Sequence, residues 1–155
     1  MRIAINGMGR IGRLLFRRLI NNPAFTLVAV NDIMDRENLL YLLKYDSVYG
    51  TFQNDIQLVE NTIITGEKEV VVLQQDHPSK LEWNKLAVDL VLECSGKFTT
   101  RATATEHVKA GAKKVLLSTT GSPDIPLLIH GFNQSKLTAD IDIVSPGGCM
   151  TNCST

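Results

Sequence analysis

A glycine-rich turn between a buried strand and a helix is the feature of this sequence that most restricts its fold. Residues 2–5 (RIAI) form a short apolar run typical of a buried strand, and apolar residues recur at helical spacing over 11–19. Between them stand Gly7, Gly9 and Gly12 in the pattern Gly-x-Gly-x-x-Gly. Such glycines permit a tight turn, close backbone approach to a pyrophosphate, and close packing of the helix on the strand. We therefore predict a dinucleotide site, with the pyrophosphate at the helix N-terminus.

A carboxylate after the second predicted strand supports this interpretation. The apolar run 27–30 (LVAV) ends in Asn31 and Asp32, and Asp32 lies twenty residues beyond Gly12. At that spacing an acidic side chain accepts hydrogen bonds from the adenosine ribose. The alternative is a structural turn followed by a surface aspartate, and the spacing favours the dinucleotide site. Because Asp32 would repel a 2′-phosphate, the sequence favours NAD over NADP.

Composition limits the classes of protein to which the chain belongs. Its 155 residues are 44% hydrophobic and 21% charged, which is typical of one globular domain. Lys+Arg and Asp+Glu number sixteen each, so no net field attracts nucleic acid or an anionic membrane. We expect no signal peptide and no membrane span, because the apolar runs are short. Three cysteines form neither a disulfide framework nor a CxxC pair, which favours a cytoplasmic setting without a metal site.

Strands alternate with helices along most of the chain, which predicts an α/β fold. Specifically, we expect a Rossmann-type doubly wound, mostly parallel sheet with a small antiparallel excursion over 55–74. Residues 45–50 are predicted to be a loop, and Asp35 is predicted to cap the second helix. The predicted strands outside the excursion are 2–5, 25–31, 88–94, 114–118, 127–129 and 142–144, and the predicted helices are 10–21, 36–43 and 99–111.

The last residues hold a candidate nucleophile. The turn Pro146-Gly147-Gly148 leads to Cys149 at a predicted helix start, where free N–H groups and the helix dipole stabilise a thiolate. Free cysteines are more often inert packing residues, so the spacing alone leaves both interpretations open.

Six sequence blocks together resemble the glyceraldehyde-3-phosphate dehydrogenase family. They occur in the family's order and cover the chain from end to end: INGMGRIGRL at 5–14, YDSVYGTF at 45–52, PSKLEW at 78–83, ECSGKFTT at 93–100, GAKKVLLS at 111–118 and CMTNC at 149–153. The resemblance implies NAD-dependent oxidation of a small phosphorylated aldehyde. The aldehyde would form a thiohemiacetal on the cysteine, and the resulting thioester would pass to inorganic phosphate.

The resemblance also assigns roles to single residues. Cys149 matches the nucleophile, the backbone of Arg10 and Ile11 matches the pyrophosphate contacts, and Asp32 matches the ribose carboxylate. Three further residues match the family's loops beside the cofactor, namely Ser95, Gly96 and Ser118. The whole protein is expected to be a homotetramer.

The residues beside the nucleophile depart from the family pattern. Members usually carry serine and threonine on either side of the cysteine, and these hydroxyls hold the attacking phosphate. Here the neighbours are Gly148 and Met150, which have no hydroxyl. A first alternative is therefore an erythrose-4-phosphate dehydrogenase, which passes the acyl group to water. A second is a non-catalytic dinucleotide-binding module with an unused cysteine.

By this resemblance, residues 1–148 are the dinucleotide-binding domain and residues 149–155 begin a catalytic domain. The family's histidine base and substrate-binding groups follow later in its sequence, so we expect this chain to be a fragment that is inactive alone. Its three histidines, His77, His107 and His130, are predicted to be surface or capping residues.

Overall fold

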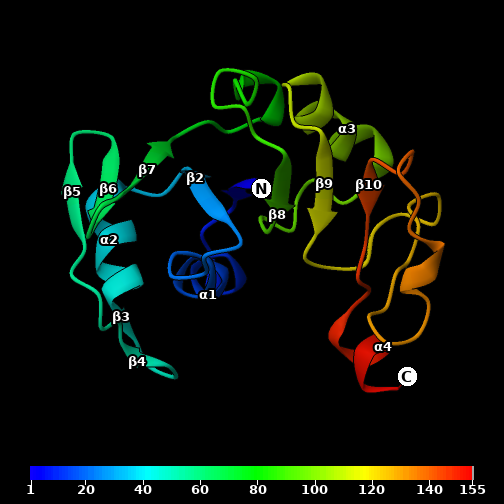
Figure 1. Cartoon of the computed structure of the whole chain (residues 1–155), viewed down its shortest axis with the longest axis horizontal. Helices are drawn as coiled ribbons and strands as arrows, with labels where there is room; N and C mark the ends of the chain where they lie inside the picture. Colours follow the sequence, from blue (N-terminus) through cyan, green and yellow to red (C-terminus); the bar gives the residue numbers. More distant parts are fainter. Residues whose placement is uncertain (155) are drawn as a thin grey trace.

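One eight-stranded sheet runs through the molecule in the computed structural model, which describes residues 1–154 (Figure 1). The strand order is β10-β9-β8-β1-β2-β7-β6-β5, and neighbours from β10 to β7 run parallel. The strands are β1 Arg2–Asn6, β2 Thr26–Asn31, β5 Gln57–Val59, β6 Thr62–Thr65, β7 Lys68–Leu73, β8 Leu90–Glu93, β9 Lys114–Leu117 and β10 Ile143–Val144. From β1 the chain adds β2 and β7 on one side, then β8, β9 and β10 on the other. The order therefore reverses between β1 and β8, which makes the sheet doubly wound as predicted.

Four helices accompany the sheet within the described residues. They are α1 Arg10–Leu19, α2 Arg36–Lys44, α3 Arg101–Lys109 and α4 Cys149–Cys153, with 3₁₀ turns at Pro78–Lys80 and Gln134–Lys136. The side chain of Asp35 accepts the Asn38 N–H at 3.1 Å, so the predicted cap of α2 is confirmed. A capping box between Thr100 and Thr103 starts α3.

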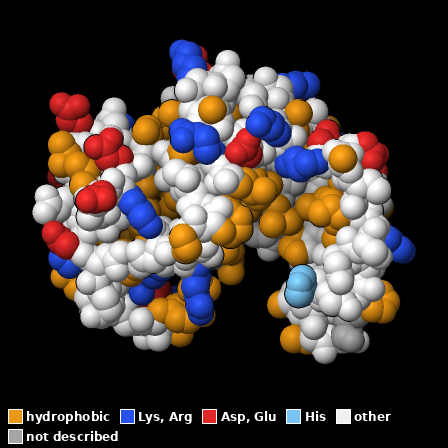
Figure 2. Space-filling model, in the orientation of Figure 1, with side chains coloured by type: hydrophobic (Ala, Val, Ile, Leu, Met, Phe, Trp, Pro, Cys, Tyr) orange, Lys and Arg blue, Asp and Glu red, His pale blue; other side chains and the backbone are white. Residues whose placement is uncertain are grey.

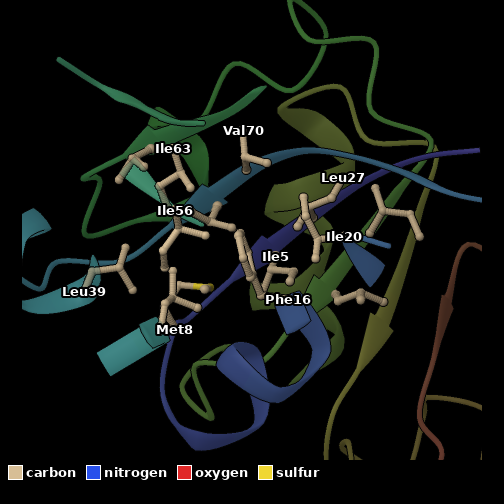
Figure 3. Close-up of a cluster of buried hydrophobic side chains, with 14 residues drawn as sticks. Ile5, Met8, Phe16, Ile20, Leu27, Leu39, Ile56, Ile63 and Val70 are labelled. Atoms are coloured by element: carbon tan, nitrogen blue, oxygen red, sulfur yellow. The ribbon is translucent and has the colours of Figure 1, made fainter. Parts of the chain in front are cut away.

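Alternate side chains of β1 enter two separate cores, one on each face of the sheet. Ile3 and Ile5 join the larger cluster with Phe16 of α1, and Figure 3 shows Phe16 lying beside Ile5 in this cluster. Ala4 faces the other way, into a cluster that contains the fully buried Trp83. Both faces of β1 are therefore buried, as expected for a central parallel strand.

The predicted antiparallel excursion is confirmed. β5 and β6 form a hairpin, and β6 also pairs antiparallel with β7. β7 pairs parallel with β2 on its other side, so the excursion extends the main sheet.

Two predictions of secondary structure were wrong, and each has a local cause. Residues 45–50 were predicted as a loop, but Tyr45–Asp46 (β3) pairs antiparallel with Gly50–Thr51 (β4). Asp46 Oδ1 accepts the N–H groups of Val48 and Tyr49 at 2.8 and 2.9 Å, which closes this small hairpin.

Residues 127–129 were predicted as a strand, but they form only an isolated bridge between Leu127 and Ser145. The Asn133 side chain accepts the Ile129 N–H at 2.6 Å and donates to the Leu127 carbonyl at 3.0 Å. The Asn133 side chain thus bonds to backbone groups of Leu127 and Ile129 that would otherwise pair with a neighbouring strand.

No helix in the described part of the chain is long and apolar enough to cross a membrane. Residues 1–154 also contain no cluster of three or more potential metal-ligating side chains.

Candidate functional site

The loops that follow β1 and β8 meet at the point where the strand order reverses, which is where open α/β sheets bind ligands. Gly7 has φ +92°, and a Cβ added to it would lie 2.4 Å from the Ser95 backbone nitrogen. A cavity of about 220 Å³ opens beside this contact. Its lining comprises Asn6, Gly7, Gly9, Asn31, Asp32, Ile33, Gln75, Asp76, Cys94, Ser95, Lys97 and Phe98.

Each glycine of the fingerprint has a distinct environment. A Cβ on Gly12 would lie 2.0 Å from the Gly7 carbonyl oxygen, so Gly12 allows α1 to pack against the turn. A Cβ on Gly9 would have no atom within 4 Å, so this glycine leaves open space at the start of α1. No side chain caps α1, and its first turn has no acidic residue. The first N–H groups, including those of Arg10 and Ile11, therefore remain available to an anion.

Asp32 connects the end of β2 to the glycine turn. Its Oδ2 accepts the Met8 N–H at 2.6 Å, and its Oδ1 accepts the Met34 N–H at 2.8 Å. A carboxylate has about four acceptor positions, so Asp32 retains capacity for ribose hydroxyls. Asp32 is part of the cavity lining.

The other predicted cofactor residues differ in their distance from the cavity. Ser95 lines it, whereas Gly96 is the next residue, in an exposed left-handed turn with φ +71°. Ser118 follows β9, donates its N–H to the Glu93 carbonyl at 2.9 Å, and is not part of the cavity lining.

Two asparagines in the lining were missed by the sequence analysis. Asn6 and Asn31 end β1 and β2, and Asn31 Nδ2 donates to Asn6 Oδ1 at 2.7 Å. Asn31 Oδ1 also accepts the Gln75 N–H at 2.8 Å. The signal was an asparagine at the end of each apolar strand, where a buried polar side chain requires partners.

The prediction for His107 was wrong, because its side chain is fully buried. Its Nε2 lies 2.8 Å from Glu93 Oε2, and Glu93 is only 1% exposed. The surface prediction failed because the partner of His107 lies on β8 and not on its own helix, α3. The other two predictions hold, since His77 caps the 3₁₀ turn at Pro78 and His130 is exposed.

Cys149 is exposed and is the first residue of α4. Asn152 Nδ2 donates to the Pro146 and Gly148 carbonyls at 3.0 Å each, which closes the turn before the cysteine. Figure 1 shows β8 and β9 pointing toward the edge of the sheet where α4 lies.

Cys94 differs from Cys149 in its surroundings. It lines the cavity and is partly buried, and burial raises the pKa of its thiol to about 12.

A larger hollow of about 560 Å³ lies against β8, β9 and β10 but contains none of the predicted site residues. Apolar side chains such as Leu116, Leu128 and Val144 dominate it. Figure 2 shows hydrophobic side chains along the upper wall of a deep notch in the molecule.

The cavity of about 220 Å³ beside Gly7 and Ser95 is the better candidate for a dinucleotide, because polar groups converge there on the uncapped start of α1.

Comparison with known proteins shows the family of the chain. The family model described as glyceraldehyde 3-phosphate dehydrogenase, NAD binding domain, matches residues 1–101. The chain belongs to the glyceraldehyde-3-phosphate dehydrogenase family. Within it, the chain is 42% identical over 152 residues to a glyceraldehyde-3-phosphate dehydrogenase of Clostridium acetobutylicum. It is 40% identical over 154 residues to glyceraldehyde-3-phosphate dehydrogenase 1 of Bacillus subtilis.

These alignments cover 98% and 99% of this chain but 46% of each relative. The chain thus spans about half the length of the curated relatives that it matches. Residues 1–101 match the NAD-binding domain of the family, so NAD is the cofactor of this chain. The open space beside Gly9 and the uncapped start of α1 fit the pyrophosphate of NAD, and Asp32 fits a ribose without a 2′-phosphate.

Proposed function

We propose that this chain is the NAD-binding part of an oxidoreductase that converts a small phosphorylated aldehyde through a covalent intermediate on Cys149. The observation that carries the proposal is the contact between Gly7 and Ser95 at the reversal of strand order, beside a helix start without a cap. Membership of the glyceraldehyde-3-phosphate dehydrogenase family supports the type of reaction.

NAD would be held by the two loops and the start of α1. The N–H groups of Arg10 and Ile11 would bind the pyrophosphate, since Gly9 leaves the approach open. Asp32 would accept hydrogen bonds from the adenosine ribose. The remaining proposed contributors to the cofactor site are Gly7, Gly12, Ser95, Gly96 and Ser118.

Cys149 would act as the nucleophile. Its exposed thiolate would add to the carbonyl carbon of the aldehyde and form a thiohemiacetal. Bound NAD supplies the hydride acceptor that oxidises such an adduct to a thioester. The Cys149 N–H, at the start of α4, would donate to the oxyanion that forms on the substrate. Residues 1–148 would then form the cofactor domain, and residues 149–155 would begin the catalytic one.

Inorganic phosphate is the proposed acceptor of the acyl group, and water is the alternative. The alternative has a specific basis, because Gly148 and Met150 place no hydroxyl beside Cys149. An enzyme of that type would oxidise erythrose-4-phosphate without needing phosphate.

The proposed function can be tested on the protein encoded by the complete gene. We expect phosphate-dependent reduction of NAD with glyceraldehyde-3-phosphate, abolished in Cys149→Ser and retained in Cys153→Ser. Cys153 is a matched control, since it is an exposed cysteine on the same short helix. Phosphate-independent oxidation of erythrose-4-phosphate would select the alternative acceptor. Full activity of Cys149→Ser would overturn the proposal.

A further inference from the structure

The Glu93 carboxylate is the centre of a buried hydrogen-bond network at the end of β8. Its Oε2 accepts from Asn6 Nδ2 at 2.5 Å and lies 2.8 Å from His107 Nε2. Its Oε1 accepts from the Ser95 N–H at 2.7 Å and from the Ser95 hydroxyl at 2.5 Å. A buried carboxylate is stable only with such partners, and here both oxygens have two.

The tautomer of His107 follows from a second contact. Trp83 Nε1 donates to His107 Nδ1 at 3.0 Å, and an indole nitrogen can only donate. His107 Nδ1 must therefore accept, so the proton of a neutral imidazole is on Nε2 and points at Glu93. All four groups that face the Glu93 carboxylate are then donors.

The network joins both loops of the NAD site. Asn6 immediately precedes Gly7, and Ser95 is the residue against which Gly7 packs. The Glu93 carboxylate therefore bonds to Asn6, the last residue before one loop, and to Ser95 in the other loop. With backbone already against backbone there, a change in one loop must displace the other.

We propose that Glu93 is a positioning residue for NAD, which acts by holding the Asn6 and Ser95 loops in the geometry that the dinucleotide requires. His107 belongs to the same hydrogen-bond network. It donates its Nε2–H to Glu93, and the hydrogen bond from Trp83 to its Nδ1 fixes this tautomer. Neither Glu93 nor His107 lines the cavity, so both act through other residues.

Substitution of Glu93→Gln tests the proposal, because glutamine has the same shape but only one acceptor oxygen. Either the Ser95 donors or those of Asn6 and His107 then face an amide NH₂ group. By calorimetric titration of the 155-residue chain, we expect NAD to bind at least tenfold more weakly. The matched control is Glu82→Gln, which changes an exposed glutamate paired with Lys85 and should leave NAD affinity unchanged.

A pair of His107 variants provides a test that leaves Glu93 intact. In His107→Gln the amide NH₂ can reach Glu93 from the position of Nε2, whereas in His107→Asn the amide oxygen can accept from Trp83 but no donor reaches Glu93. Both remove the same ring, so a purely structural role predicts equal NAD affinity. We expect several-fold weaker binding in His107→Asn than in His107→Gln.

The folded state of each variant can be followed directly. Trp83 is the only tryptophan, so a single dispersed indole N–H resonance reports that the core around His107 is intact. Folded Glu93→Gln with unchanged NAD affinity would overturn the proposal, as would equal affinities of the two His107 variants. Failure of the unaltered chain to bind NAD would also overturn it. None of these results depends on Cys149, so they are distinct from the test of the proposed reaction.

Discussion

Gly7 and Ser95 are packed so closely that a Cβ on Gly7 would lie 2.4 Å from the Ser95 nitrogen and 2.5 Å from its Cα. The two residues lie on different loops, and the contact holds these loops together where the paired strands β1 and β8 end. The three glycines of the fingerprint therefore matter for packing at the end of the sheet as well as for ligand binding. Two of its glycines are required by packing, and the third leaves room for the cofactor.

These different environments predict that Gly7→Ala mainly lowers the stability of the fold, whereas Gly9→Ala mainly lowers the affinity for NAD. Gly7→Ala introduces a backbone clash at φ +92°, so we expect the free energy of unfolding to fall by about 2–4 kcal/mol. Gly9 has an extended backbone with open space around it, so Gly9→Ala should cost about 1 kcal/mol or less as a change of helix cap. It should nevertheless weaken NAD binding more than tenfold. Urea titration and calorimetry measure the two effects, and equal losses of stability would contradict the prediction.

Asp32→Asn should weaken NAD binding about tenfold and reduce discrimination against NADP, because it removes the charge that repels a 2′-phosphate. The ratio of the NAD and NADP dissociation constants measures this directly. Asp35→Asn is the matched control, since asparagine caps a helix as well as aspartate does. An unchanged ratio in Asp32→Asn would show that another group selects the cofactor.

The cysteines should differ in reactivity. Burial raises the pKa of Cys94 to about 12, so its thiolate is scarce at pH 8 and alkylation should be slow. Cys149 and Cys153 are exposed and should both react. Mass spectrometry after brief iodoacetamide treatment of the folded chain should find two modifications, and a third after unfolding in urea. Rapid modification of Cys94 in the folded chain would contradict this expectation.

Asp89 should contribute to acid sensitivity. The Arg2 N–H at 2.8 Å and the Lys113 ammonium at 2.6 Å hold the pKa of its carboxyl below the usual value. A carboxyl with a lowered folded-state pKa stabilises the fold above its unfolded pKa of about 3.9, and this contribution disappears as the pH falls through the folded pKa. Asp89→Asn should therefore be less stable than the unaltered chain at pH 7. The difference should shrink toward pH 2 in urea titrations, and a constant difference would contradict the assignment.

The features predicted correctly depend on neighbours in the sequence. The apolar run of β1, the glycines after it and the cap at Asp35 each operate within a few residues, so periodicity and turn chemistry reveal them. The position of Asp32 was predictable because the strand–helix–strand unit fixes its distance from the turn.

The features that were missed depend on partners far along the chain. Asn6 and Glu93 are 87 residues apart, and His107 is 14 residues from Glu93 on a helix whose sequence gives no sign of burial. Only the sheet order and the packing of α3 on the sheet bring these side chains together. The glutamate that ends the apolar run of β8 was the available signal, since burial of a charge requires a specific partner.

The two outer strands of the sheet have a consequence for assembly. β10 has two residues and β5 has three, so each offers few backbone hydrogen bonds to a strand from another molecule. The longer strands β1, β2 and β8 each have a neighbour on both sides. A wide sheet can add strands from other molecules at its edges and so form fibrils. The short edge strands β5 and β10 oppose such pairing.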